Sequence, residues 1–116
     1  MKARGAGWIA AVAAILAWGR AHAARPDAGR VVYEQRCAAC HGATGGGDGP
    51  AAAAIEPRPR NFRDPDFWRG RSAEDLRRVV RDGKPGTLMA PFAGVLSDAD
   101  IEAVVAFLAS FRSPGR

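Results

Sequence analysis

The sequence predicts an all-α domain in which three main helices are joined by long irregular loops. Two observations support this fold class. Apolar residues recur at helical spacing in three separate stretches, whereas no strand-like alternation is long enough to count. Glycine and proline gather between these stretches, where they favour turns over regular structure. A chain of 116 residues has room for one domain at most.

The start of the chain has the pattern of a secretory signal peptide. A charged beginning precedes the apolar run "WIAAVAAILAW", and small residues suited to cleavage after Ala23 or Ala24 follow it. An uncleaved membrane anchor is the alternative, although a spanning helix needs about 20 apolar residues and this run is shorter. We therefore expect residues 1–23 to be a signal peptide and residues 24–116 to form a domain that is exported to the periplasm.

Removal of the signal peptide changes the charge of the protein. The full chain carries a formal charge of +5 and has a pI of about 10.2. The first 23 residues hold three basic and no acidic residues, so 14 basic and 12 acidic residues remain and the formal charge falls to +2. The basic residues between Arg58 and Lys84 are interspersed with acids, which indicates a mixed, solvated surface. The charge gives no reason to expect nucleic-acid binding.

The first helix is expected from about Asp27 to Cys37. Asp27 follows a proline and is suited to the N-cap position. Tyr33 and Cys37 lie four residues apart and therefore share one face of this helix. The helix would deliver the residues after Cys37 at its C-terminal end.

The second and third helices are expected over residues 72–82 and 98–111. A serine–aspartate capping box begins each helix: Ser72 with Asp75, and Ser97 with Asp100. Gly83 ends the second helix, and Pro114 prevents continuation of the third. Their predicted apolar stripes are Leu76, Val79 and Val80 in the second helix, and Ile101, Val104, Val105, Leu108 and Phe111 in the third.

The stretch "CAACHG", residues 37–42, places two cysteines beside a histidine. Such a pair can be a dithiol redox couple, half of a zinc site or a haem attachment site. A dithiol site of the thioredoxin kind needs a preceding strand, and no strand is expected before Cys37. A zinc site needs further ligands, yet the domain has no other cysteine or histidine once the signal peptide is removed. In a haem site, Cys37 and Cys40 would bind the porphyrin covalently and His41 would coordinate its iron.

The second axial ligand of such an iron is predicted to be Met89. It is the only methionine besides the initiator, and it lies in the glycine- and proline-flanked segment "GTLMAPF". A lone methionine also suits a hydrophobic core as a gap-filler. Without the signal peptide the domain offers no second histidine for a bis-histidine site, while Lys84 or an open position remain alternatives.

At this point the domain resembles the small class I c-type cytochromes of bacteria. The resemblance rests on the haem motif, on "GDGPAA" and "GTLMAPF" as the two ligand loops, and on "VVAFL" in the last helix. It implies a cytochrome c-like fold of three main helices wrapped around one covalent haem c. It also implies that Gly29 permits close approach of the first and last helices, while Tyr33 meets Phe107.

The resemblance implies further roles around the haem. A proline carbonyl is expected to accept a hydrogen bond from His41, with Pro50, Pro57 and Pro59 as candidates and Pro50 preferred. A polar residue or tryptophan is expected near a propionate, and the candidates are Arg60, Asn61 and Trp68, although Trp68 suits core packing equally. In this family a proline often follows the methionine directly, whereas here Ala90 intervenes, so the path of this loop is less well defined.

Two axial ligands would leave substrate no access to the iron, which favours an electron carrier over an enzyme. We therefore expect a periplasmic single-haem electron-transfer protein that docks transiently with redox partner proteins at the haem edge. The first alternative is a haem subunit of a larger dehydrogenase or oxidase, and the second is a haem-based gas sensor. The protein could also associate with a membrane-bound respiratory complex. No nucleic-acid partner is expected.

Overall fold

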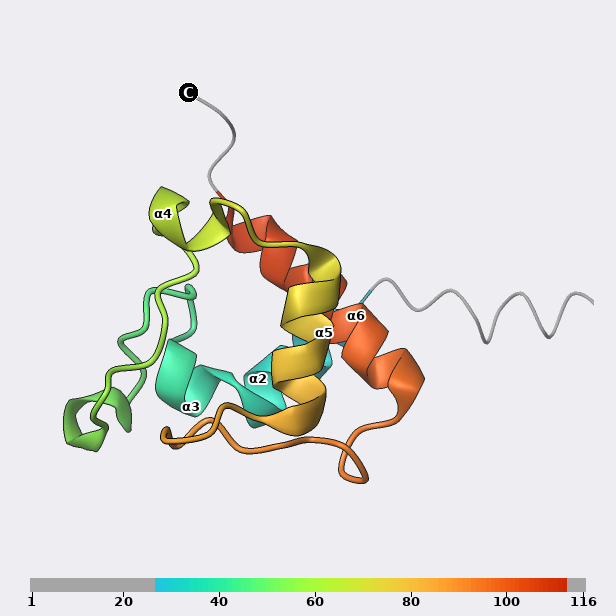
Figure 1. Ribbon diagram of the computed structural model, residues 1–116, viewed down its shortest axis with the longest axis horizontal. Coiled ribbons are helices and arrows are strands. Elements are labelled where there is room, and N and C mark those ends of the chain that lie inside the picture. The colour runs from blue at the N-terminus through green and yellow to red at the C-terminus, as the bar shows by residue number, and fades with distance from the viewer. Residues whose placement is uncertain (1–26, 113–116) are drawn as a thin grey trace, which may run out of the picture.

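The computed structural model describes residues 27–112 as a set of helices joined by long loops (Figure 1). The elements are α2 (Ala28–Arg36), α3 (Ala38–His41), η1 (Ala52–Ala54), α4 (Pro65–Trp68), α5 (Ala73–Asp82), α6 (Asp98–Leu108) and η2 (Ala109–Phe111). Within this part of the chain there is one isolated bridge, between Ala93 and Leu96, and no strand. The predicted all-α fold class is confirmed. The predicted signal peptide lies outside the described residues.

The first and last long helices, α2 and α6, cross at Gly29. A Cβ atom at this position would overlap the backbone of Ala103 and lie 2.8 Å from the Cβ atom of Phe107. One turn along α2, the Tyr33 ring packs on the Phe107 ring with centroids 5.3 Å apart. Both features were expected from the sequence. The crossing fixes the orientation of α2 and therefore of the motif that follows it.

The core lies where α2, α5 and α6 meet. Tyr33 and Val104 are its most completely buried large side chains. The other buried apolar residues come from the three helices and from the segment around α4: Val32, Phe62, Phe67, Trp68, Leu76, Val80, Ile101, Val105 and Leu108. The predicted stripe of the last helix is therefore buried, with Phe111 packed half-buried against it.

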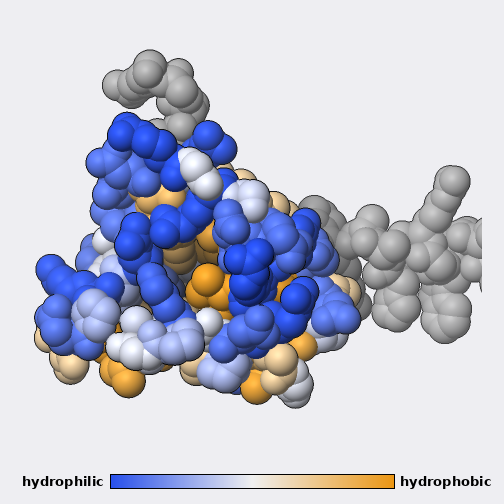
Figure 2. Space-filling model, viewed as in Figure 1, coloured by the Kyte–Doolittle hydropathy of each residue, from blue (hydrophilic) through white to orange (hydrophobic). Residues whose placement is uncertain are grey.

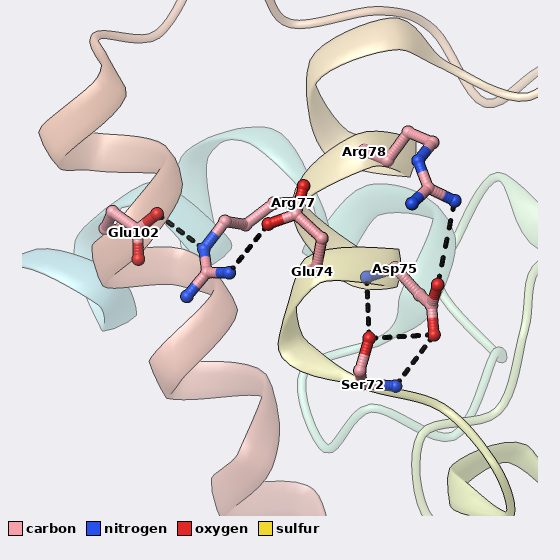
Figure 3. A network of polar contacts seen from close by, with 6 residues as sticks. All are labelled: Ser72, Glu74, Asp75, Arg77, Arg78 and Glu102. Carbon is pink, nitrogen blue, oxygen red and sulfur yellow. Dashed lines mark hydrogen bonds and ion pairs between the residues drawn. The ribbon is translucent and has the colours of Figure 1, made fainter.

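A capping box begins α5, as predicted. The Asp75 backbone N–H donates to the Ser72 hydroxyl at 3.1 Å, and the Ser72 backbone N–H donates to the Asp75 carboxylate at 2.8 Å (Figure 3). One turn further along, Arg77 forms ion pairs with Glu74 of the same helix and with Glu102 of α6. This network fixes where α5 begins and ties it to α6.

No helix within residues 27–112 is long and apolar enough to cross a membrane.

Three details differ from the sequence prediction. Asp27 occupies the N-cap position of α2 but makes no side-chain capping bond, because its backbone is in the helical region instead of the extended conformation that caps require. Val79 is 37 % exposed instead of buried with Leu76 and Val80. At the start of α6 the structure has one half of the predicted capping box, in which the Ser97 hydroxyl accepts from the Asp100 N–H at 3.1 Å, and not the full reciprocal pair that begins α5.

Candidate haem site

The two cysteines and the histidine of the motif lie on a single helical turn. Cys37 interrupts the helix, with φ of −121° and ψ of −34°, and so separates α2 from α3. The backbone N–H groups of Cys40 and His41 both donate to the Cys37 carbonyl, at 3.2 and 2.9 Å. Residues at spacings of three and four share one helix face. The three side chains that could hold a haem are therefore brought together by local structure.

Cys37 and Cys40 form no disulfide with each other, and both are half-buried. Cys37 packs against the hydrophobic core. Burial, followed by the nearby Cys40, raises the pKa of the Cys37 thiol to about 11. The thiol is therefore neutral at physiological pH in the polypeptide itself, which suits an apolar environment.

His41 is oriented by the backbone of the long loop between η1 and α4. Its Nδ1 atom lies 3.0 Å from the Arg60 carbonyl oxygen. A carbonyl only accepts, so Nδ1 carries the proton and Nε2 is left with a free lone pair. Burial lowers the pKa of His41, and the Arg60 bond opposes this only in part. The imidazole is thus held neutral, as a metal ligand must be.

The prediction that a proline carbonyl orients His41 is wrong. The acceptor is the carbonyl of Arg60, which directly follows Pro59, and neither Pro50 nor Pro57 fills this role. Pro50 was preferred because it is close to the motif in the sequence, in the turn that folds back over α3. The actual acceptor comes from a segment 19 residues away from His41. The hydrogen-bonding function was foreseen, and the residue that provides it was not.

The glycine-rich loop after the motif covers the C-terminal end of α3. The N–H groups of Gly47, Gly49 and Ala51 donate to the carbonyls of His41, Cys40 and Ala39, at 2.7, 3.1 and 2.9 Å. A side chain at Gly49 would overlap the backbone of α3. The glycines are therefore needed so that the loop can lie against the motif and satisfy the carbonyls that a helix end leaves unpaired.

Tyr33 connects the helix crossing to this loop. Its hydroxyl donates to the Gly42 carbonyl at 2.6 Å, and the side chain is only 1 % exposed. Burial raises the pKa of this phenol above its ordinary value. The α2–α6 packing and the position of the motif are thus coupled through one residue.

Met89 lies in a loop that is tied to the end of α5. Gly83 ends α5 with a positive φ of 71°, and the Lys84 N–H donates to the Met89 carbonyl at 3.1 Å. The Thr87 hydroxyl accepts from the Met89 N–H at 3.2 Å. The loop then returns, and the Phe92 N–H donates to the Val80 carbonyl at 2.9 Å. Met89 is half-buried in this arrangement.

The surface beside these elements is hollowed. In Figure 1, α3, α5, the segment that leads to α4 and the loop after α5 frame an opening. The space-filling view shows a hollow at this place, with hydrophobic surface at its floor and hydrophilic residues around its rim (Figure 2). An apolar hollow bordered by α3, the helix of the haem motif, suits the flat, largely apolar ring of a haem.

Of the three residues predicted near a propionate, Trp68 has its polar group engaged elsewhere. Its indole N–H donates to the Phe62 carbonyl at 2.7 Å, and the side chain is 8 % exposed. The structure therefore supports the core-packing role of Trp68. Arg60 and Asn61 are exposed. Phe62 itself, which contacts His41, was missed because a single aromatic residue in a loop carries no periodic pattern.

Comparison with known proteins identifies the family. Residues 24–108 match the family described as cytochrome C oxidase, cbb3-type, subunit III. The chain belongs to this family of c-type cytochromes. The resemblance seen in the sequence is confirmed, and so is the cofactor, a covalently attached haem c.

Two curated relatives differ greatly in size. The chain is 37 % identical over 89 residues to a dihydro-heme d1 dehydrogenase of Pseudomonas aeruginosa, and this match covers 76 % of the chain but only 15 % of that protein. It is 35 % identical over 88 residues to cytochrome c55X of Paracoccus denitrificans, with 74 % of each protein covered. The same kind of domain therefore occurs within a large redox enzyme and as a small cytochrome.

A solved c-type cytochrome, KustC0563, has the same fold. The match has a TM-score of 0.62 at 26 % identity and covers 73 % of this chain and 98 % of the solved one. This comparison confirms the cytochrome c-like arrangement of the helices. Electron transfer is the general function of such proteins.

Proposed function

We propose that this cytochrome is a periplasmic single-haem electron carrier. In this proposal Cys37 and Cys40 bind haem c covalently, while His41 and Met89 coordinate its iron. Bound haem c supplies a one-electron couple between ferrous and ferric iron. The observation that carries the proposal is the single helical turn that presents Cys37, Cys40 and His41 together, with Nδ1 of His41 hydrogen-bonded to the Arg60 carbonyl so that Nε2 is the ring nitrogen with the lone pair.

The surrounding chain supports the carrier function by holding its ligands in place. The Arg60 carbonyl fixes His41, and the bonds of Met89 to Lys84 and Thr87 shape the loop that carries the second proposed ligand. Ligands that are held by backbone contacts need little rearrangement when the iron changes its charge. A neutral thioether and a buried ring both favour the ferrous state, and so raise the reduction potential.

Partner proteins would dock at the rim of the hollow. Leu88, which precedes Met89, is 69 % exposed and offers apolar surface beside a proposed ligand. Interfaces of weak redox encounters bury less than about 1,200 Å² in total. Such a contact would release its partner quickly, as an electron carrier requires.

Localisation in the periplasm is proposed from the signal peptide expected at residues 1–23.

A second candidate function is that of a haem subunit in a larger redox complex. The match to 15 % of a dehydrogenase favours it, because a domain of this kind is built into that enzyme. Gel filtration of the native protein from its own cells separates the two. A free carrier is expected to elute at the size of a single small domain, and a subunit is expected to co-elute with partner polypeptides.

The optical spectrum of the purified holoprotein tests the carrier proposal. The oxidised protein should show the weak absorption band at the red edge of the visible range that methionine-to-iron charge transfer produces. The reduced protein should bind carbon monoxide slowly, because both axial positions are filled. Absence of the band together with rapid carbon monoxide binding would refute six-coordination and favour a gas-binding function.

A further inference from the structure

The face of the His41 imidazole is covered by an aromatic side chain from a distant part of the chain. The Phe62 ring is stacked on the His41 ring, with centroids 4.5 Å apart and an angle of 20° between the planes. Phe62 is 6 % exposed. No step of the proposed function above uses this contact.

The position of Phe62 is fixed through its backbone on both sides. Its N–H donates to the Gly45 carbonyl at 2.7 Å, and its carbonyl accepts from the Trp68 indole at 2.7 Å. These are short bonds for N–H donors. Gly45 belongs to the loop that covers α3, and Trp68 is the last residue of α4. Phe62 therefore joins the two segments on either side of it.

The Phe62 ring is also held by other aromatic rings. Phe67 packs against it edge to face, with centroids 5.1 Å apart, and Phe111 lies nearly parallel to it at 6.3 Å. Aromatic pairs in such arrangements are favoured beyond the area they bury. A ring with so many neighbours cannot turn freely, so its plane is a fixed reference for the imidazole next to it.

The two contacts of His41 with this segment restrain different motions. A hydrogen bond from Nδ1 to the Arg60 carbonyl directs that edge of the ring, but hydrogen bonds tolerate a range of angles, so the ring keeps some freedom of rotation. Stacking on Phe62 restrains this rotation, because it holds the two planes parallel. Arg60 and Phe62 are separated by one residue, so one short stretch of loop sets both the direction and the plane of the imidazole.

We propose that Phe62 is a positioning residue that sets the plane of the His41 imidazole. The proposal rests on the ligation of iron by His41 described above. The plane of an axial imidazole determines which iron d orbital it overlaps, and so affects the distribution of unpaired electron density over the haem. The Phe62 ring also keeps water from one imidazole face, which favours the less charged ferrous state.

Proton NMR of the oxidised holoprotein tests this directly, because the paramagnetic shifts of the four haem methyl groups depend on the imidazole plane. Phe62→Leu should change the order or the spread of these shifts and lower the reduction potential. Phe62→Tyr keeps a ring at this position and should restore the parent pattern. Ile101→Ala is the matched control, since Ile101 of α6 is buried to a similar degree, at 2 % exposure, and is not one of the aromatic residues around His41.

The outcomes separate a positioning role from packing. An unchanged methyl pattern and potential in Phe62→Leu would overturn the proposal, and so would an equal change in Ile101→Ala. If Phe62→Leu does not fold, Trp68→Phe removes the indole donor and keeps a ring; it should shift the methyl pattern, and an unaltered pattern would refute the proposal. A parent protein without low-spin histidine-ligated signals would instead refute the ligation itself.

Discussion

Gly29 of α2 lies so close to Ala103 of α6 that a Cβ atom on Gly29 would overlap the Ala103 carbonyl oxygen. The same Cβ atom would also lie 2.8 Å from the Cβ atom of Phe107 in α6. The α2–α6 crossing therefore depends on the missing side chain. Because α2 leads directly into the haem motif, the distance between these two helices also affects the haem site.

Replacement of Gly29 should loosen this crossing. Gly29→Ala inserts a methyl group where there is no space, and overpacking of this kind costs about 1–3 kcal/mol of unfolding free energy. Gln35→Ala, at an exposed position of the same helix, should change stability by less than about 0.5 kcal/mol. Chemical denaturation of the two holoproteins measures the difference. Equal stability of the two variants would show that α2 and α6 are free to move apart.

Loss of the N-cap of α5 should weaken the whole domain, since α5 packs on α6. Ser72 accepts the Asp75 N–H bond at the beginning of α5. Ser72→Ala should lower the unfolding free energy by about 1 kcal/mol, as is typical for N-cap serines. Ser72→Asn can cap a helix as well as serine and serves as the control. The account of the cap is wrong if Ser72→Asn and Ser72→Ala are equally destabilised.

The other half of the capping box should make stability depend on pH. Hydrogen bonds from the Ser72 backbone and hydroxyl lower the pKa of the Asp75 carboxyl below its ordinary value of 3.8. A lowered pKa in the folded state means that the carboxylate stabilises the protein above the unfolded-state pKa. This contribution is lost as the pH falls through the lower, folded-state pKa.

Asp75→Asn should therefore melt below the parent protein at neutral pH, and the difference in melting temperature should shrink once the pH falls below about 3.8. Taking the difference between variant and parent at each pH removes effects of the haem that the two share. Asp66→Asn, at an exposed carboxylate paired with Arg69, is the control. A difference for Asp75→Asn that does not change with pH would contradict the assignment.

Removal of the thiols should affect haem binding and folding together. In Cys37→Ala/Cys40→Ala no covalent link can form, so haem staining of a denaturing gel should be lost. The hollow beside the motif would then lack its main apolar filling, and helical circular dichroism should fall with it. A cooperative helical melt of the haem-free double variant would show that the polypeptide folds without its cofactor.

The parts of the fold that the sequence predicts are those with local signals. Serine–aspartate pairs mark where α5 and α6 begin, and the 3.6-residue repeat marks which residues of α6 are buried. The helix crossing was foreseen because Gly29 and Tyr33 have the spacing of a known pair. The short helix α4 was missed, since four residues cannot display a helical period.

The sequence predicts which residues of the candidate site lie together only where they form a motif. Cys37, Cys40 and His41 are neighbours, and local structure alone brings them together. The partners of His41 come from residues 60 to 62, and their approach depends on how the long loop packs against α3. A carbonyl acceptor can be supplied by any residue, so no residue type marked Arg60 for this role.

The central claim, that Met89 is the second axial ligand in an electron carrier, is tested most directly by Met89→Ala. The variant should keep its covalent haem, lose the absorption band at the red edge of the oxidised spectrum, acquire rapid carbon monoxide binding when reduced, and have a lower reduction potential. Leu88→Ala, at the preceding exposed position, should retain the parent spectrum. An unchanged spectrum and potential in Met89→Ala would contradict the account.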